Sequence, residues 1–307
     1  MTEHHGEHMG SAPPVRHVPV LLEETLTLLA PKPGQVWVDA TVGAGGHARR
    51  LAEAIGPEGR LIAVDQDPAM LALARSRLAG LPVTFIPSRF DGLPQILPTL
   101  GLDQVDGLLA DLGFASDQVD DPQRGLSFRQ DGPLDMRMDP TADLTAEDIV
   151  NTWSERDLAR LLWEYGEERY SRRIARRIVE QRRRQPLRTT GELAELVRSC
   201  VPRGGGIDPA TRTFQALRIA VNDELGALER LLTALPRLIR PGGRVGIISF
   251  HSLEDRRVKQ AFRDPGIWQM VTKKPVTPTP EETIRNPRAR SAKLRVAQRG
   301  DRPASNP

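Results

Sequence analysis

Three acidic residues stand at positions where a carboxylate could bind a small molecule or move a proton. Asp39 lies in an apolar run that precedes a glycine-rich turn, while Asp65 and Asp111 each directly follow an apolar run. A carboxylate at the end of such a strand can accept hydrogen bonds from ribose hydroxyls, and one beside the reacting atoms can take up a proton. The expected chemistry is that of a site for a nucleoside-bearing cofactor.

Residues 36–47 must position these acids, because they predict a buried strand, a glycine turn and the start of a helix. β-Branched and aromatic residues favour the strand. Gly43, Gly45 and Gly46 permit backbone conformations and a close approach that a Cβ would forbid. Residues 43–48 fit the pattern G-x-G-x-x-G/A, and an acid at the end of a second strand indicates a nucleoside-binding βαβ unit.

Two features of this turn distinguish between the cofactors that such units bind. A dinucleotide needs a turn that seats its pyrophosphate. Here Asp39 lies inside the strand, before Gly43, and the turn is a short G-x-G-G, so we predict S-adenosylmethionine (SAM). Asp67, which precedes Pro68, fits a helix N-cap, and this leaves Asp65 to accept hydrogen bonds from the ribose.

Alternating patterns predict an α/β fold around this unit. The expected strands are residues 36–38, 61–64, 83–86, 105–110 and 244–250, with a closing hairpin of 267–274 and 293–299. The expected helices are residues 17–24, 48–55, 69–78, a short one after 91, several within 145–200, and 211–238. Ligands of open α/β sheets bind outside the carboxyl ends of strands, so Asp65, Phe90 and Asp111 should converge. Phe90 would then suit stacking against an adenine.

The expected fold is a doubly wound sheet interrupted between its fourth and fifth strands by a helical domain. Residues 118–139 lack periodicity and mix apolar, turn and charged residues, so we expect an ordered loop near the active site. The domain prediction is a disordered tail at 1–16, a SAM-binding domain of 17–139 and 212–300, and an inserted helical substrate-recognition domain of 140–211.

Composition is that of a soluble globular protein, with 39% hydrophobic and 27% charged residues. The single cysteine, Cys200, excludes an internal disulfide and a cysteine metal cluster, so we expect no metal and a reducing cytoplasm. No apolar run reaches the length of a membrane span, and no membrane contact is expected.

The net charge of +3 is unevenly distributed. Residues 169–188 carry +8 and residues 256–302 carry +9, so the rest of the chain carries −14. Two basic segments on an otherwise acidic chain indicate a polyanionic partner whose phosphates supply affinity. A solvated charged face is the alternative, but nearly unopposed arginine favours RNA. The candidate phosphate contacts are Arg172, Arg173, Arg176 and Arg177.

Seven ordered motifs carry a resemblance to a known family. They are residues 39–47, 124–128, 131–139, 165–169, 211–216, 248–255 and 286–295. Together they resemble the RsmH (MraW) family, bacterial methyltransferases that modify N4 of a decoding-site cytidine in 16S ribosomal RNA. The resemblance spans nearly everything from His17 to Arg299. It implies a Rossmann-like class I SAM-dependent methyltransferase that acts on 16S rRNA within the small ribosomal subunit, with a homodimer left open.

The resemblance also implies a set of site residues. SAM would be held by Gly45, Gly46, His47, Asp65, Phe90, Asp111 and Gln118. Cytosine N4 accepts a methyl group poorly because its lone pair is delocalised into the ring, so an oxygen that accepts from N4–H would help. Asp111 is our candidate, with Ser116 as a weaker helper; alternatively, Asp111 only holds the methionine part of SAM. Phe114, which with Ala115 replaces the usual Val-Ser of the family, or Phe128 offers a stacking face for a flipped base.

Two functions from other classes are alternatives. The glycine pattern permits a nicotinamide-dependent oxidoreductase, although that would not explain two arginine-rich segments. A non-catalytic RNA-binding or ribosome-assembly protein with a methyltransferase fold would explain them. His251 and Glu254 with Ser252 suggest a hydrolase triad, but the G-x-S-x-G elbow is absent from the sequence.

Overall fold

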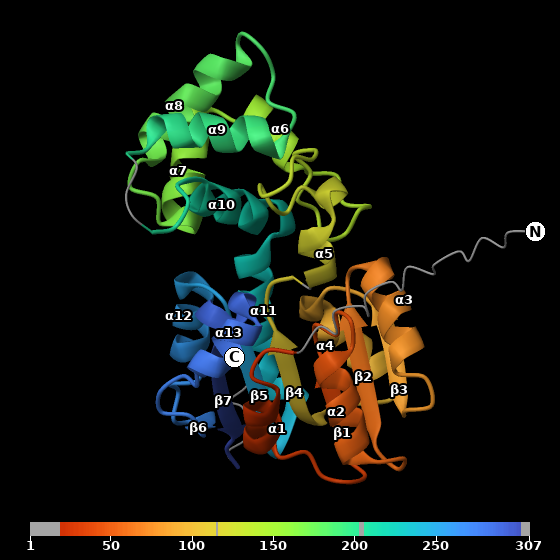
Figure 1. The fold of residues 1–307 in the computed structure, drawn as a ribbon. Coiled ribbons are helices and arrows are strands. Elements are labelled where there is room, and N and C mark those ends of the chain that lie inside the picture. The colour runs from red at the N-terminus through yellow and green to blue at the C-terminus, as the bar shows by residue number, and fades with distance from the viewer. Residues whose placement is uncertain (1–18, 115, 203–205, 302–307) are drawn as a thin grey trace, which may run out of the picture.

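The structure is a computed structural model that describes residues 19–114, 116–202 and 206–301, excluding the side chains of residues 116 and 117. The tail expected at residues 1–16 lies outside these ranges. Figure 1 shows two layers of helices around one sheet, with a group of further helices above the sheet. None of the described helices combines the length and apolarity needed to cross a membrane.

Seven strands form the sheet in the order β3-β2-β1-β4-β5-β7-β6 (Figure 1). The parallel strands are β1 (Val36–Asp39), β2 (Arg60–Asp65), β3 (Val83–Pro87), β4 (Val105–Asp111) and β5 (Ile239–Ser249). β7 (Lys293–Arg299) runs antiparallel to β5 and to the short β6 (Trp268–Met270), which confirms the closing hairpin. The chain leaves β1 toward β2 and β3, and later returns to β4 on the other side. A doubly wound sheet binds ligands at such a switch point.

Alternate residues of the central strands supply two separate cores. In β2, Leu61 packs into one core and Ile62 into the other, and both are fully buried. Because both faces of the sheet are buried, its parallel strands are apolar along their length and do not alternate with polar residues. The helices of the first face are α1 (Leu22–Leu29), α2 (Gly46–Ile55) and α3 (Pro68–Arg77). Those of the second are α4 (Leu93–Thr99), α11 (Glu224–Leu238) and α12 (Ser252–Ala261).

The helices between β4 and β5 pack around a third core, beyond the carboxyl edge of the sheet (Figure 1). The helices that form this core are α6 (Ala146–Thr152), α7 (Glu155–Gly166), α8 (Ser171–Arg182), α9 (Thr190–Cys200) and α10 (Ala210–Asn222), and we call residues 146–222 the helical region. Capping boxes begin α6 and α9, where Thr145 pairs with Asp148 and Thr189 with Glu192. The helical interruption was predicted at this point of the chain.

Three predicted elements differ in the structure. The helix expected at 211–238 is two helices, because Asp223 adopts a left-handed conformation with φ of 49°. The leading helix begins at Leu22 and not at His17, which lies outside the described residues. β5 was expected at 244–250 but begins at Ile239, and its pairing with β4 is irregular between Ile239 and Arg244.

Candidate active site

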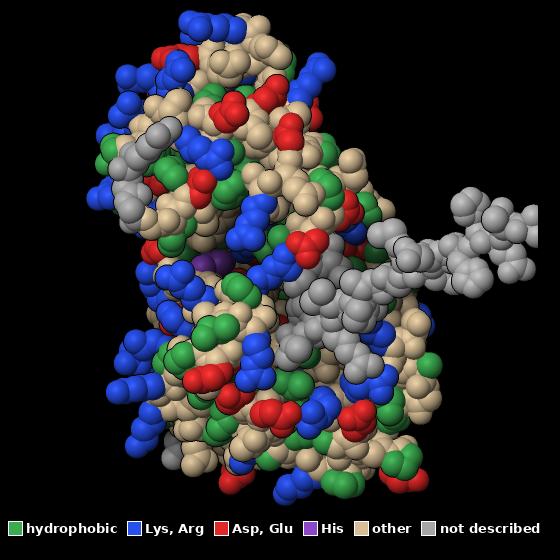
Figure 2. All heavy atoms as spheres, viewed as in Figure 1, with side chains coloured by type: hydrophobic (Ala, Val, Ile, Leu, Met, Phe, Trp, Pro, Cys, Tyr) green, Lys and Arg blue, Asp and Glu red, His purple; other side chains and the backbone are tan. Residues whose placement is uncertain are grey.

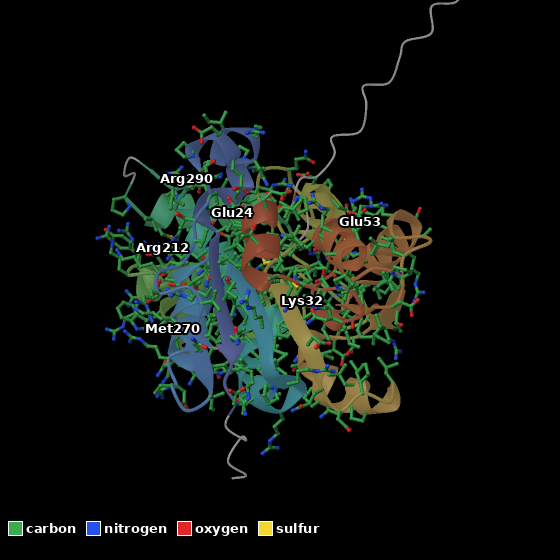
Figure 3. The ribbon with its side chains drawn as sticks, turned by 90° about the horizontal axis from the view of Figure 1, so that it is seen from below. Glu24, Lys32, Glu53, Arg212, Met270 and Arg290 are labelled. Atoms are coloured by element: carbon green, nitrogen blue, oxygen red, sulfur yellow. The ribbon has the colours of Figure 1, made fainter. Side chains whose placement is uncertain are left out.

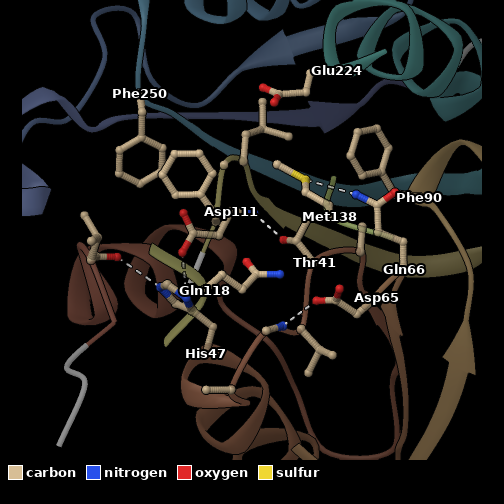
Figure 4. Close-up of a pocket in the computed structure, with 18 of the residues that line it drawn as sticks. Thr41, His47, Asp65, Gln66, Phe90, Asp111, Gln118, Met138, Glu224 and Phe250 are labelled. Atoms are coloured by element: carbon tan, nitrogen blue, oxygen red, sulfur yellow. Dashed lines mark hydrogen bonds and ion pairs between the residues drawn. The ribbon is translucent and has the colours of Figure 1, made fainter. Parts of the chain in front are cut away.

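A pocket opens at the carboxyl edge of the sheet, where the ends of β1, β2, β4 and β5 meet. The predicted site residues that line it are Gly46, His47, Asp65, Phe90, Asp111 and Gln118. Figure 4 shows Phe90 beside Gln66 and Asp65 at one end, and Phe250 near Asp111 at the other. The sequence therefore located this pocket, and the sheet brings together residues from distant parts of the chain.

The glycine turn builds one wall of the pocket. Gly43 and Gly45 have φ of 47° and 85°, a left-handed conformation that glycine adopts without strain. A Cβ at Gly46 would lie 2.3 Å from the ring of Pro19, so only glycine lets the preceding segment cross the turn here. Gly45 caps α2 and does not itself line the pocket. The first turn of α2 holds no acid, so its N-terminus suits a carboxylate group of a ligand.

Asp65 joins this turn to the nucleoside end of the pocket. Its Oδ2 accepts from the backbone N–H of Gly43 at 2.9 Å, and its Oδ1 from that of Asp67 at 2.9 Å. Burial raises the pKa of the Asp65 carboxyl, against the opposing effect of these backbone hydrogen bonds. Both oxygens are thus partly used by the protein, but each carboxylate oxygen has a second lone pair for a ligand hydroxyl.

Asp67 is the N-cap that the sequence predicted for α3. Its Oδ1 accepts from the backbone N–H of Ala69 at 2.9 Å. Its Oδ2 accepts from Gln118 at 2.8 Å and from Arg124 at 2.7 Å. Gln118 and Arg124 come from the loop that we expected near the active site, so a fully buried carboxylate ties that loop to the sheet.

Asp111 occupies the switch point between β1 and β4. Its Oδ1 is buried without a hydrogen-bond partner, and its Oδ2 lies 3.6 Å from Nδ1 of His47. His47 is oriented by the carbonyl of Val20, which lies 3.0 Å from its Nε2. Burial raises the pKa of Asp111 well above its ordinary value, and the neighbouring carboxylates of Asp39 and Glu254 raise it further. A cationic ligand beside Asp111 would oppose this effect and favour the ionised form of its carboxyl.

Glu254 is a pocket residue that the sequence suggested only as a member of a rejected triad. Its Oε2 accepts from the backbone N–H groups of Phe250 at 2.8 Å and His251 at 3.3 Å. Burial alone would raise its pKa, but His251 and Arg218 lower it below the ordinary value. The pKa values of Glu254 and Asp111 are therefore shifted in opposite directions. The available signal was an acid just beyond a strand end.

Phe250, Glu224 and Phe114 complete the far end of the pocket. Arg218 donates to both oxygens of Glu224, at 2.7 and 2.8 Å, and its guanidinium lies 4.4 Å from the ring centre of Phe114. Ligand atoms of Glu224, His251 and Glu254 lie within 4.8 Å of one another, a spacing that a metal could bridge. Because Arg218 already neutralises Glu224, we assign no metal to them.

The remaining expected residues fall elsewhere. Phe128 packs against Phe214 at a ring-centre distance of 4.8 Å within the helical region, and it is not among the residues that line the pocket. Ser116 begins the short α5 (Ser116–Asp120), but its side chain lies outside the described part of the chain. Of the two stacking candidates, Phe114 lines the pocket.

The charge of the pocket distinguishes between the two candidate cofactors. Its acidic lining residues are Asp65, Asp111, Glu224 and Glu254. Arg89 and Arg288 also line it, but Arg89 is paired with Asp91 at 2.7 Å and Arg288 with Asp120. An acidic wall with paired arginines disfavours a pyrophosphate and suits a nucleoside that carries cationic groups.

The comparisons with known proteins agree on one family. The model described as the MraW methylase family matches residues 14–300. A "Ribosomal RNA small subunit methyltransferase H" from Sorangium cellulosum is 54% identical, over 92% of this chain and 91% of that protein. Proteins of the same name from Paenibacillus sp. (49% identical, 92% and 99% covered) and Cyanothece sp. (52%, 94% and 96%) are similar. A crystal structure of an rRNA methylase from Streptococcus thermophilus has a TM-score of 0.46 at 10% identity, covering 92% of this chain and 99% of that one.

Proposed function

The chain belongs to the MraW methylase family, and from this premise we propose that it transfers a methyl group from SAM to ribosomal RNA of the small subunit. The observation that carries the proposal is the acidic pocket at the switch point, with Asp65 and Phe90 at one end and Asp111 near the other. The finer proposal is that the acceptor is N4 of a decoding-site cytidine in 16S rRNA, which rests on the motif resemblance.

The pocket residues fit the parts of SAM one by one. Asp65 would accept from the ribose hydroxyls, and Phe90 would stack on the adenine. The N-terminus of α2, with Gly45, Gly46 and His47, would face the methionine carboxylate, and Gln118 would complete the wall. When bound, SAM supplies a methyl group on a good leaving group, so the protein's task is to hold the acceptor in line at near-attack distance.

Asp111 is the proposed catalytic residue, with Ser116 as its helper. The Asp111 side chain is 24% exposed and its Oδ1 has no hydrogen-bond partner among the described residues, so its carboxylate is the proposed acceptor for the N4–H of a cytosine. Such a hydrogen bond would localise the nitrogen lone pair, and the carboxylate would then take the proton. Burial raises the pKa of Asp111, and the positive charge of SAM would favour the ionised carboxylate that this role needs. Phe114 offers the flipped base a stacking face at the same end of the pocket.

The inserted helices are the proposed substrate-recognition domain, with the boundaries 140–211. Arg172 and Arg173 of α8 are exposed, and neither forms an ion pair with a described residue. Arg176 lies 3.7 Å from Glu155 and Arg177 lies 2.9 Å from Glu180. Exposed, largely unopposed guanidinium groups suit phosphate contacts.

Methyl transfer from labelled SAM to small ribosomal subunits that lack the modification tests the proposal. We expect one methyl group per subunit, recovered as N4-methylcytidine after nuclease digestion and mass spectrometry. A methyl group on another atom would contradict the N4 proposal. RNA binding without any methyl transfer would favour the assembly-factor alternative, and calorimetry that finds NAD binding but no SAM binding would favour an oxidoreductase.

A further inference from the structure

Trp163 is the exposed aromatic residue of the helical region. Its side chain is 61% exposed, whereas Trp37 and Trp268 are buried and Trp153 packs against the helical core. An isolated exposed hydrophobic residue needs no explanation by itself. The side chains around Trp163 are therefore needed to decide whether it has a binding role.

Trp163 lies within a stripe of charged residues along one face of α7. Arg156, Arg160 and Trp163 are spaced by four and three residues, so the helix presents them on the same side, and Glu167 follows as the C-cap residue of α7. Arg160 is 66% exposed and has only an i,i+3 neighbour, Asp157, at 3.4 Å. Arg156 is exposed and makes no ion pair with any described residue. Two exposed guanidinium groups therefore precede the indole on this face of the helix.

The lower end of this stripe reaches the rim of the pocket. Glu167 accepts from the hydroxyl of Ser252 and from Arg256, at 3.1 Å, and its carbonyl accepts from Arg212 at 3.2 Å. Ser252 begins α12 two residues after Phe250, which lines the pocket. Trp163 precedes Glu167 by about one helical turn, roughly 6 Å along the axis.

The stripe also joins the two basic segments of the sequence. Figure 1 places α7 between α8 above and α12 below, and Figure 2 shows Lys and Arg side chains gathered along that same flank. Seen from below in Figure 3, Arg212 and Arg290 lie along one side of the molecule. A polyanion that follows this flank from α8 toward α12 would pass α7.

We propose that Trp163 is a stacking platform for an unpaired base of the RNA substrate, with Arg156 and Arg160 contacting the adjacent phosphates. The inference rests on the proposed function, because it takes RNA as the partner, and adds a recognition surface outside the pocket. A target base that enters an active-site pocket must be unpaired, so its neighbours on the strand are available for stacking. In sites that bind single-stranded nucleic acid, aromatic rings stack on bases of any kind and neighbouring cationic side chains contact the phosphate backbone.

Charge complementarity favours RNA over a protein partner. A helix of a partner protein would need a contiguous apolar patch to dock on, and a single indole near arginines is too small for that. Among the described residues, the other exposed large hydrophobics are Ile207, Met270 and Ile284, and none of them lies on α7. α7 also carries Glu155, which lies 3.7 Å from Arg176, Asp157, which lies 3.4 Å from Arg160, and Glu164. The surface thus offers one planar apolar group beside two exposed arginines.

Intrinsic fluorescence gives a direct test, because Trp163 is the most exposed tryptophan of the described chain. Full-length protein is titrated with a single-stranded oligoribonucleotide and with small ribosomal subunits. We expect saturable quenching in the wild type and its loss in Trp163→Phe, which keeps most of the affinity. Trp163→Ala should weaken binding about 5- to 100-fold, the range for one stacked base. Ile207→Ala, a change at a 76% exposed site of the same region, should alter neither quantity.

SAM affinity is the control: we expect it to be unchanged in every variant, which would show that each variant is folded. Wild-type protein that neither binds RNA nor methylates small subunits would overturn the proposed function. Wild-type binding and methylation, with unchanged affinity in Trp163→Ala and undiminished quenching in Trp163→Phe, would overturn this inference alone. A Trp163→Ala variant that changes its oligomeric state and not its RNA affinity would also overturn it and would assign the surface to a second copy.

Discussion

The pocket and the arginine-bearing faces of α7 and α8 carry opposite charges and differ in burial. Carboxylates line the pocket, and burial raises the pKa values of two of them, Asp65 and Asp111. On α7 and α8 the arginines stand in solvent, where salt screens them. An RNA backbone would be attracted to the helices and repelled from the pocket, while a neutral base could enter it. Overall affinity and the choice of reacting atom are thus assigned to different regions.

The same difference sets the size of the effects that substitutions should have. Charges in a buried site interact strongly because little water screens them, whereas exposed charges contribute small amounts that fall with salt. Changes in the pocket should therefore alter catalysis and SAM binding by large factors. Changes on the helices should alter RNA binding by smaller, salt-dependent factors and leave SAM binding alone.

The largest effect is expected for Asp111→Asn. This change keeps the shape but removes the charge, and loss of a general base typically costs about 100-fold or more in rate. Single-turnover methylation of small subunits at saturating SAM measures the rate, and calorimetry measures SAM affinity. If affinity falls while the bound-state rate survives, Asp111 is a cofactor ligand and not the proton acceptor.

Asp65→Ala should weaken SAM binding at least tenfold. The loss of hydrogen bonds to a charged group costs on the order of 1.5–3 kcal/mol. The substitution also leaves the N–H groups of Gly43 and Asp67 without their acceptor, so Asp65→Asn, which retains one carbonyl oxygen, should lose less. Unchanged affinity in Asp65→Ala would place the ribose elsewhere.

Pocket residues that follow a local motif were predictable from the sequence, and those that depend on distant packing were not. A glycine turn and an acid at a strand end are local signals, so Gly43, Asp65 and Asp111 were identified. Phe250 and Glu254 reach the pocket because β5 pairs with β4 across the whole helical region. The strand was predicted from the sequence, but the position of its carboxyl end relative to the pocket was not.

Helix periodicity also failed at a point where tertiary contacts decide the backbone. The amphipathic patterns of α10 and α11 join without interruption, so they predicted one helix. The corner at Asp223 is stabilised by its carboxylate, which accepts from Arg230 at 2.5 Å and lies 3.4 Å from Arg89. Arg89 is far away in the sequence, and no local pattern could have indicated this partner. Phe128 likewise looked available for stacking until packing placed it against Phe214.

On the helical side, a double change of Arg172→Gln and Arg173→Gln should reduce the salt dependence of RNA binding. Each lost phosphate contact should lower the slope of log K against log salt by roughly one unit. SAM affinity should not move. Arg237→Gln, at an exposed arginine beside the opposite edge of the sheet, serves as the control and should leave the slope unchanged. An unaltered slope in the double variant would make this surface a solvated face.

The smallest effect is expected in the pH dependence of stability. Burial raises the pKa of Asp39 to about 7 and raises those of Asp65 and Asp111. The folded protein therefore retains protons that the unfolded chain releases above about pH 4, and the associated stability is lost as pH rises through about 7. The Tm of the ligand-free protein should fall by a few degrees between pH 5.5 and 8.

The same titration should act in the opposite direction when SAM is present. Its cationic groups favour ionised carboxylates, so the stabilisation that SAM provides should grow over that pH range. Asp39→Asn should flatten the profile of the ligand-free protein, because it removes one of the titrating groups. A wild-type Tm that rises between pH 5.5 and 8 without SAM would contradict the raised pKa values.

The position of the helical region between two neighbouring strands has a consequence for the order of folding. β4 and β5 pair directly, yet residues 112–238 separate them in the chain. Before β4 and β5 can pair, the two ends of this long loop must come together, and that closure costs conformational entropy. Pairing is therefore slow while the intervening chain is extended. Compaction of α6 to α10 around their own core would bring those ends near each other. We therefore expect the centre of the sheet to form late, after the helices that bridge it.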